Sequence, residues 1–266
     1  MDLTDFINKI IDTTFKVITK VYQKQKESNF SEIEPSYNSL IVFPKTKDDE
    51  DKAEDKAEDR ISEQELRFIF VEQFNKEVEK IGNNLFYSIE TPTDEFYYFS
   101  GESPRCIPKN EHKRKKEKGE NGAGRSANID LVILQKDGKC INRVALIEFK
   151  AHNPKTEDYR KDICKLINEN SSCLKYFIQI IDNGSDFNDY GKINDNKLEK
   201  RKGNTLASIK TKIGKPDELR EKTMNIKDDY QITYWCVNLN KHTKVKGTIN
   251  KDGLEYKLCE PSSTEE

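Results

Sequence analysis

Several features that define other classes of protein are missing from this sequence. It has no signal peptide and no apolar run near the roughly 20 residues of a membrane span, which predicts a soluble, cytoplasmic chain. None of its six cysteines forms a C-x-x-C pair or a Cys/His cluster with zinc spacing, which argues against a zinc site. The absence of a P-loop, a G-x-G-x-x-G motif and internal repeats argues against the common nucleotide-binding and repeat folds.

Length and charge set broad limits. The chain has 266 residues, enough for one large domain or for one domain with an appendage. Charged residues make up 35% and hydrophobic residues 34%, which is compatible with a globular core that carries solvated arms. The formal net charge of −2 neither favours nor excludes a nucleic-acid partner, so the distribution of charge along the chain is more informative.

Two short apolar runs organise the chain. Residues 129–134 read IDLVIL and residues 144–150 read VALIEFK, and both runs are rich in β-branched residues, which predicts buried strands. Asp137 and Gly138 between them are a strong turn signal and predict an antiparallel hairpin. Folding the hairpin about position 139 brings Asp130 opposite Glu148.

The same hairpin carries charged residues at its open end. Glu148 and Lys150 are two residues apart, so they share one face of the strand, and Phe149 points to the other face. Two carboxylates and one ammonium group are therefore expected to meet there. Because isolated buried charges are costly, such a cluster with room for a divalent metal is a stable arrangement, whereas without metal one carboxylate would take up a proton.

Asp130 followed by Glu148-Phe149-Lys150 resembles the PD-(D/E)xK nuclease superfamily, over roughly residues 61–181. Ile129 stands where the family name has proline, a position that varies in the family. The resemblance implies an α/β fold with a central mixed β-sheet flanked by helices, a restriction-endonuclease-like core. It also implies hydrolysis of phosphodiester bonds in nucleic acid, with DNA favoured over RNA and RNA left open, and a role in restriction or anti-phage defence.

The resemblance assigns roles to individual residues. Asp130 and Glu148 would bind Mg²⁺ or Mn²⁺ with the Phe149 carbonyl as a third ligand, in keeping with the preference of Mg²⁺ for hard oxygen donors. Lys150 would orient or help to deprotonate the attacking water and offset negative charge. A helix before the first strand often adds a glutamate in this family, for which Glu65 is the first candidate and Glu72 the second. Glu65 also fits a capping box with Ser62, which requires no catalytic role.

Residues 1–60 are expected to form an N-terminal extension to a domain at 61–260, and residues 261–266 a disordered tail. Helical spacing over residues 1–26 predicts an amphipathic helix that packs on the domain or on a second copy, or that docks on a partner protein. Its acidic residues make a membrane role less suitable. Residues 48–59 form an acidic run, read as a solvated linker or as a phosphate mimic that shields a basic cleft.

The remaining elements follow from periodicity and turn residues. Helices are predicted over residues 66–80, 156–168 and 197–213, and strands over 85–90, 95–100, 174–181 and 231–239, before a hairpin over 244–258. Residues 103–125 read as a mobile insertion. Three groups are candidates to contact nucleic-acid phosphates: Lys113, Arg114, Lys115, Lys116 and Arg125 in the insertion, Lys165 on the second of these helices, and Lys200, Arg201 and Lys202 on the third.

The same residues also fit other interpretations. Lys165 and Asp162, three residues apart, would equally fit a surface ion pair, and the basic insertion would equally fit a solvated loop. The leading hypothesis is an active metal-dependent nuclease. The alternatives are a catalytically silent module of this fold that binds nucleic acid or a protein, an interaction protein that works through its N-terminal helix, and an unrelated α/β domain with a buried Glu–Lys pair.

Overall fold

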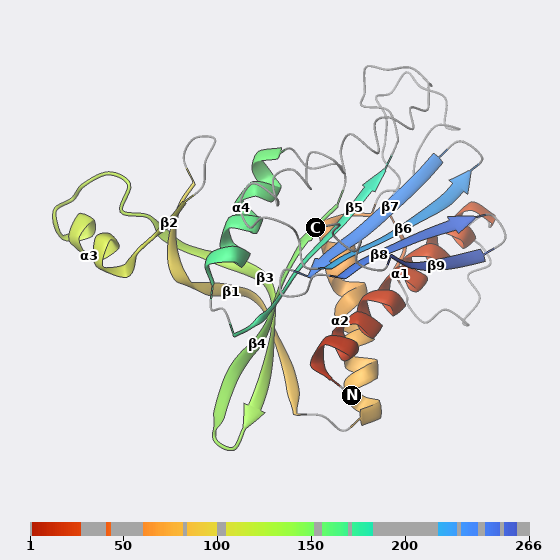
Figure 1. Cartoon of the computed structure of the whole chain (residues 1–266), viewed down its shortest axis with the longest axis horizontal. Helices are drawn as coiled ribbons and strands as arrows, with labels where there is room; N and C mark the ends of the chain where they lie inside the picture. Colours follow the sequence, from red (N-terminus) through yellow and green to blue (C-terminus); the bar gives the residue numbers. More distant parts are fainter. Residues whose placement is uncertain are drawn as a thin grey trace, which may run out of the picture.

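The computed structural model describes residues 2–27, 41–43, 61–81, 84–99, 105–151, 156–169, 172–182, 218–227, 230–238, 243–250 and 253–259 (Figure 1). Four helices are described: α1 (Leu3–Glu27), α2 (Glu63–Ile81), α3 (Lys109–Glu117) and α4 (Thr156–Asn168). The strands are β1 (Leu85–Tyr98), β2 (Arg105–Ile107), β3 (Arg125–Asp137), β4 (Cys140–Lys150), β5 (Leu174–Asp182), β6 (Glu218–Lys227), β7 (Tyr230–Asn238), β8 (Thr243–Asn250) and β9 (Gly253–Cys259).

The described strands form one mixed sheet in the order β2-β1-β3-β4-β5-β7-β6-β8-β9. β1, β3 and β4 are successive antiparallel neighbours, and β5 lies parallel to β4 after the crossover through α4. The predicted α/β class with a mixed sheet and flanking helices is confirmed. The strands predicted at 129–134, 144–150, 174–181 and 231–239 and the terminal hairpin are also confirmed, whereas β6 was not predicted.

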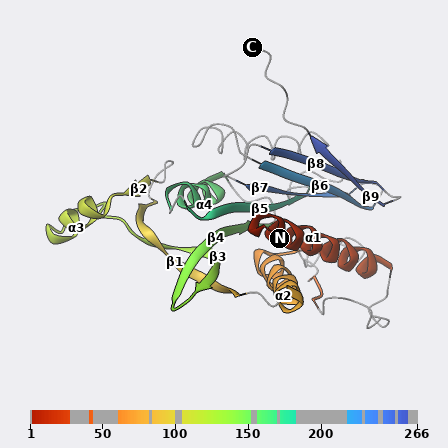
Figure 2. The ribbon, with the colours of Figure 1, turned by 60° about the horizontal axis from the view of Figure 1, so that its bottom comes forward.

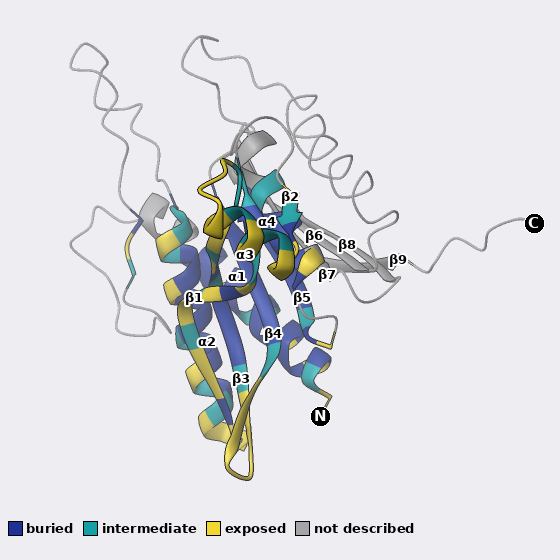
Figure 3. Cartoon of the chain, turned by 90° about the vertical axis from the view of Figure 1, so that its left-hand side faces the viewer, coloured by how far each residue is buried: buried dark blue, intermediate teal, exposed yellow. Residues whose placement is uncertain are grey.

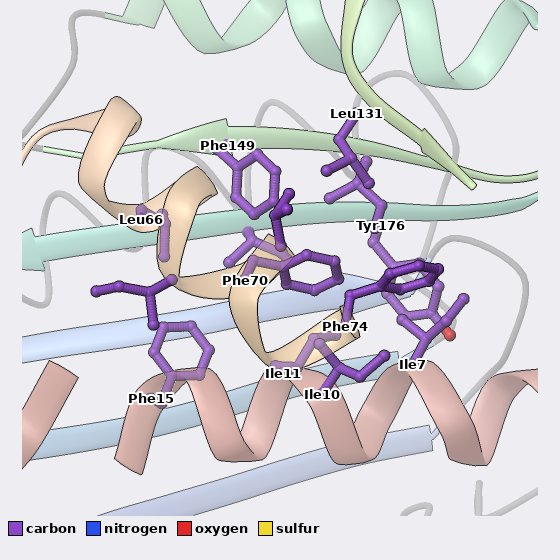
Figure 4. Close-up of a cluster of buried hydrophobic side chains, with 14 of the residues drawn as sticks. Ile7, Ile10, Ile11, Phe15, Leu66, Phe70, Phe74, Leu131, Phe149 and Tyr176 are labelled. Carbon is purple, nitrogen blue, oxygen red and sulfur yellow. The ribbon is translucent and has the colours of Figure 1, made fainter. Parts of the chain in front are cut away.

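Helices cover both faces of the central strands: α1 and α2 lie on one side and α4 on the other (Figure 2). The main hydrophobic core lies between the sheet and the α1/α2 layer, where Phe70 of α2 packs edge-on against Phe149 of β4 at 5.5 Å between ring centroids (Figure 4). Alternate residues of β4 enter this core, so Ile147 and Phe149 point toward α2. Glu148 and Lys150 consequently face the α4 side.

Helix α1 is part of this core. Its apolar stripe is buried, with Ile7 and Ile10 fully enclosed and Phe6 packed edge-on against Phe74 of α2. The expected homo-oligomer or protein partner would therefore find no exposed apolar stripe over residues 2–21, because α1 uses that stripe within the chain. No helix in the described part of the chain is long and apolar enough to cross a membrane.

The region between β1 and β3 differs from the prediction. The two strands expected at 85–90 and 95–100 are one strand, β1, with a register irregularity between Pro92 and Phe96. The insertion expected to be mobile forms β2, paired with the end of β1, and helix α3. The many turn residues of this segment suggested a loop. Three of its glycines have positive φ and form the turn that leads from α3 back to β3. The predicted helix at 197–213, the acidic run at 48–59 and the tail at 261–266 lie outside the described residues.

Candidate active site on strands β3 and β4

A β-bulge sets the register of the hairpin at the candidate site. Near the turn, Asp137 pairs with Cys140 and Leu134 with Arg143, but beyond the bulge Ile133 pairs with Ala145 and Leu131 with Ile147. Val144 is the extra residue, and Gly138 at the turn has a φ of +57°. Continuing the second register puts Asp130 level with Glu148. Without the bulge the pairing would slip by one residue, and Glu148 would no longer share a level and a face with Asp130.

Asp130 lies just beyond the paired part of the two strands. Its Oδ2 accepts a hydrogen bond from the backbone N–H of Phe149 at 2.8 Å. The Phe149 amide thus bonds to a carboxylate where a strand amide usually bonds to a backbone carbonyl. This bond holds the Asp130 side chain against the end of β4. The Asp130 side chain keeps 14% of its surface exposed, so the site has an opening to solvent at this residue.

Glu148 is fully buried beside Asp130 on the α4 side of the sheet. The Nζ of Lys165 lies 2.6 Å from its Oε1, whereas Oε2 has no hydrogen-bond partner among the described residues. Burial raises the pKa of Glu148 well above its usual range, the negative charges of Asp162 and Asp130 raise it further, and Lys165 opposes these effects. An additional positive charge next to Glu148 would therefore strongly stabilise its ionised form.

Asp162 of α4 joins the two buried lysines. Its Oδ2 lies 2.8 Å from Lys150 Nζ, and its Oδ1 lies 2.9 Å from Lys165 Nζ. Lys150 also donates to the Phe149 carbonyl at 3.2 Å, and Lys165 donates to the Asn128 carbonyl at 2.7 Å. Each ammonium group is thereby surrounded by oxygen acceptors, which holds both side chains in place.

These neighbours decide the charge state of the lysines. Burial lowers the pKa of Lys150, but Asp162, Glu63 and Asp130 outweigh it and the net pKa is raised. The pKa of Lys165 is raised in the same way, because Glu148 and Asp162 outweigh its burial. A lysine held in its charged form orients water and stabilises negative charge, and it is a poor proton acceptor. The raised pKa argues against the expectation that Lys150 helps to deprotonate water.

The first turns of α2 supply a carboxylate and a guanidinium group. Glu63 lies 3.2 Å from Lys150 Nζ, and burial raises its pKa although Lys150 opposes that shift. Arg67 is buried, donates to Glu90 Oε1 at 2.7 Å and has a second nitrogen 3.7 Å from Asp130 Oδ1. Glu90 has a φ of +50°, a conformation that a non-glycine residue seldom adopts.

The two glutamates that the sequence analysis considered for this role are engaged elsewhere. Glu65 accepts hydrogen bonds from the backbone and the hydroxyl of Ser62 and closes the capping box at the start of α2. Glu72 pairs with Lys76 one turn further along the helix, at 2.7 Å. The helix carboxylate that contacts Lys150 is Glu63, which precedes the expected position by two residues.

The predicted phosphate-contacting residues lie in different environments. Lys113, Arg114, Lys116 and Arg125 are exposed, and Lys115 pairs with Glu111 at 2.7 Å. Lys165 is buried against Glu148 and Asp162, so it is not part of a surface ion pair, and its ammonium group already contacts two carboxylates. Lys200, Arg201 and Lys202 lie outside the described residues.

Sequence reasoning missed Glu63, Arg67 and the central role of Asp162. A usable signal existed for α4, since Asp162, Lys165 and Glu169 recur at the spacing of its inward face and are all buried. Polar residues at such positions indicate a buried network and not a solvated face. No comparable pattern distinguishes Glu63 from its neighbours Gln64 and Glu65.

Two carboxylates of the site could hold a hard divalent cation whose other ligands are water. Asp130 and Glu148 offer carboxylate oxygens from adjacent strands, and the unpartnered Glu148 Oε2 is a buried acceptor without a donor. Mg²⁺ typically takes one or two carboxylates with several waters. Among the described residues no group of three His, Cys, Asp or Glu side chains is arranged to hold a metal, so an all-protein cage is not formed there.

Comparison of the chain with protein-family models, with curated proteins and with solved structures finds no match.

Proposed function

We propose that this protein is a metal-dependent nuclease of the PD-(D/E)xK type that hydrolyses phosphodiester bonds in DNA. The observation that carries the proposal is the fully buried Glu148, which has one oxygen without a partner and lies beside Asp130. A buried carboxylate with a strongly raised pKa and a nearby like charge is typical of a functional site. A divalent cation would satisfy the free oxygen and relieve the repulsion.

The arrangement of elements supports the same interpretation. Helix α2 precedes a β1–β3–β4 meander, and α4 then leads into β5, which lies parallel to β4. This is the order that the motif leads us to expect of a restriction-endonuclease-like core, so it supports the proposal. Asp130 and Glu148 lie directly beyond the last residue pair between β3 and β4, on the face of the sheet opposite the main hydrophobic core.

Each residue has a chemical task in the proposed reaction. Mg²⁺ or Mn²⁺, when bound by Asp130 and Glu148, would supply Lewis acidity and lower the pKa of the attacking water. Lys150 would orient that water and stabilise the negative charge that develops on the phosphate oxygens. Asp162 holds Lys150 and Lys165 at fixed positions, and Lys165 supplies the positive charge next to Glu148 Oε1.

A cleavage assay tests the proposal. Supercoiled plasmid and single-stranded DNA are incubated with the protein and Mg²⁺ or Mn²⁺, and wild type is compared with Asp130→Asn and Lys150→Gln. Both variants remove one charge while keeping the approximate size of the side chain, and Lys139→Gln at the hairpin turn is the control. Cutting that needs metal and survives only in the control supports the site; equal cutting by all four proteins would remove it.

A second function is favoured by one specific observation. Glu148 is fully buried and Lys150 nearly so. Lys150 and Lys165 both already have carboxylate partners within the chain. Such a network would also suit a catalytically silent module of the same fold that binds nucleic acid or a protein partner. Binding without cleavage of any DNA or RNA in Mg²⁺ or Mn²⁺ would favour this alternative.

A further inference from the structure

Residues 105–125 form a projecting unit that we call the basic arm. It comprises β2, α3 and the turn that leads into β3, and it extends from the end of β1 away from the core (Figure 1). The arm contains eight lysines or arginines against three glutamates, in a chain whose formal net charge is −2. Positive charge is thus concentrated in one structural unit and balanced by acidic residues elsewhere.

Helix α3 does not contribute to the core. None of its residues is buried, and its sequence KNEHKRKKE has no apolar side chain (Figure 3). A helix that inserts into a membrane interface needs an apolar face, which α3 does not have. Within the described part of the chain, Lys113 and Lys116 form no ion pair, so their charges serve no visible structural purpose.

Specific contacts nevertheless connect the arm to β1 and to itself. The imidazole of His112 stacks on Phe96 with ring centroids 3.6 Å apart, and its Nδ1 lies 2.8 Å from the Ala123 carbonyl, to which it donates. Gly124 has a φ of +79°, and a Cβ at that position would lie 2.9 Å from Ile107 Cγ1. An arm that is already ordered loses little conformational entropy when it binds.

The three aromatic rings of β1 at the base of the arm each pack against another side chain. Phe96 stacks on His112, Tyr97 on Phe99, and Tyr98 lies under the guanidinium group of Arg105. Proteins that bind single strands rely on free aromatic rings on which unpaired bases stack. The described arm offers none, so its chemistry suits the sugar-phosphate backbone of a duplex.

The arm and the candidate active site share one strand. β3 begins at Arg125 and reaches Asp130 five residues later, a separation of roughly 17 Å at the usual rise per residue. That is about half of the 34 Å helical repeat of duplex DNA. A duplex with one phosphate at Asp130 would therefore present further phosphates within reach of the arm.

We propose that the basic arm binds the phosphate backbone of duplex nucleic acid, without sequence preference, with Arg125 at its base about half a helical turn from the phosphate at Asp130. This inference deepens the proposed nuclease function and rests on it for the placement of the substrate. Binding by the arm itself does not require metal or cleavage.

Fluorescence anisotropy with a labelled duplex in EDTA tests the proposal. The variant Lys113→Gln/Lys116→Gln is compared with Lys136→Gln/Lys139→Gln, which removes two exposed lysines at the β3–β4 turn. We expect the arm variant to bind at least about tenfold more weakly and its salt dependence to fall by about two units of slope, one per lost phosphate contact. The control should bind like wild type; equal effects of the two variants would overturn the proposal.

Two glycine variants test the shape of the arm without changing its charge. Gly119 and Gly124 both have positive φ, but only at Gly124 would a Cβ collide with Ile107. Gly124→Ala should weaken duplex binding several-fold more than Gly119→Ala, and equal binding by the two variants would contradict the inference that a preformed arm is needed.

Two other polyanions test whether the arm prefers a duplex. A single strand of the same length should bind more weakly than the duplex, and anionic phospholipid vesicles should not compete. Tighter binding of the single strand, or displacement by vesicles, would overturn the assignment to duplex backbone. Since every measurement is made without metal, a failure of cleavage with duplex binding intact would count against the nuclease function and not against the arm.

Discussion

Lys165 Nζ lies 2.6 Å from Glu148 Oε1, so a fully buried carboxylate on β4 already has a cation beside it from α4. The contact crosses from the sheet to the helix that covers it and is reinforced by Asp162. The second carboxylate oxygen, Oε2, has no hydrogen-bond partner among the described residues, so it is the oxygen left for the proposed metal ion. The pair therefore links the stability of this site to the metal binding that we propose.

Removing Lys165 should be strongly destabilising. In Lys165→Gln the buried Glu148 loses its counter-charge, and breaking one partner of a buried pair typically costs about 3–5 kcal/mol. Urea unfolding at pH 7.5 measures the loss of unfolding free energy. The control is Lys161→Gln on the same helix, whose side chain is partly exposed and whose variant should unfold near wild type.

The double variant Glu148→Gln/Lys165→Gln isolates the interaction energy between the two residues from the contacts that each makes with its surroundings. We expect it to recover a large part of the lost stability, because a neutral amide needs no counter-charge. A double variant as unstable as the sum of the two single variants would show that the residues do not interact as their distance implies.

Stability should decrease with rising pH through Glu148. A carboxyl group whose pKa is raised by folding contributes full stability below its unfolded pKa of about 4.5, and this contribution is lost as the pH rises through the folded pKa. Thermal unfolding between pH 5 and 8 should therefore show a steeper loss in wild type than in Glu148→Gln. Parallel pH profiles of the two proteins would contradict the raised pKa.

Divalent metal should flatten that profile. Mn²⁺ favours the ionised carboxylates at Asp130 and Glu148, so it should raise the unfolding temperature of wild type more at pH 8 than at pH 5. EDTA should reverse the effect, and Asp130→Asn should abolish it. A temperature shift that is the same at both pH values in wild type and in Asp130→Asn would mean that Mn²⁺ binds elsewhere.

Two neighbouring glutamates on α2 should behave differently. Glu63→Gln removes a partner of Lys150, whereas Glu65→Gln keeps the capping box, since glutamine also closes it. Both variants remove one negative charge from the first turn of α2, so the helix-dipole effect is matched. We expect about a tenfold loss of cleavage for Glu63→Gln and near wild-type cleavage for Glu65→Gln. The opposite ranking would return the role to Glu65.

Tyr97 should couple β1 to α4. Its hydroxyl donates to Glu169 Oε1 at 2.8 Å, and both side chains are buried. Burial and the charge of Glu169 raise the pKa of Tyr97, so the phenol stays a neutral donor. Tyr97→Phe should cost about 1.5–3 kcal/mol, the usual value for a hydrogen bond to a charged group. The partly exposed Tyr98→Phe serves as the control, and equal stability of the two variants would contradict the coupling.

Much of the hairpin was predictable from local pattern. The apolar runs, the Asp137-Gly138 turn and the two-residue spacing of Glu148 and Lys150 are all short-range features. The register was predicted correctly although its cause was not, because the bulge at Val144 offsets the two-residue turn. Bulges carry no reliable local signal, since they depend on how both strands pack against the rest of the sheet.

The helix boundaries could also be predicted from nearby residues. The capping box at Ser62 and the apolar spacing predicted α2 and α4 closely, because caps and amphipathic faces are written within a few residues. The basic arm was misread for the opposite reason. Its helix has no apolar stripe, and its fold depends on contacts such as His112 with Phe96, which are distant in sequence.

The sequence by itself determined which strands carry Asp130, Glu148 and Lys150 and which faces they occupy, because strand alternation is a property of the local chain. Only the tertiary structure decided which charges surround them. Glu63, Arg67, Asp162 and Lys165 arrive from two helices on opposite sides of the sheet, and the direction in which such helices cross a sheet depends on packing over the whole core. That packing placed Lys165 and Asp162, for which the sequence left a surface pair and a substrate contact open, in a buried network, and it set the charge state of both lysines there.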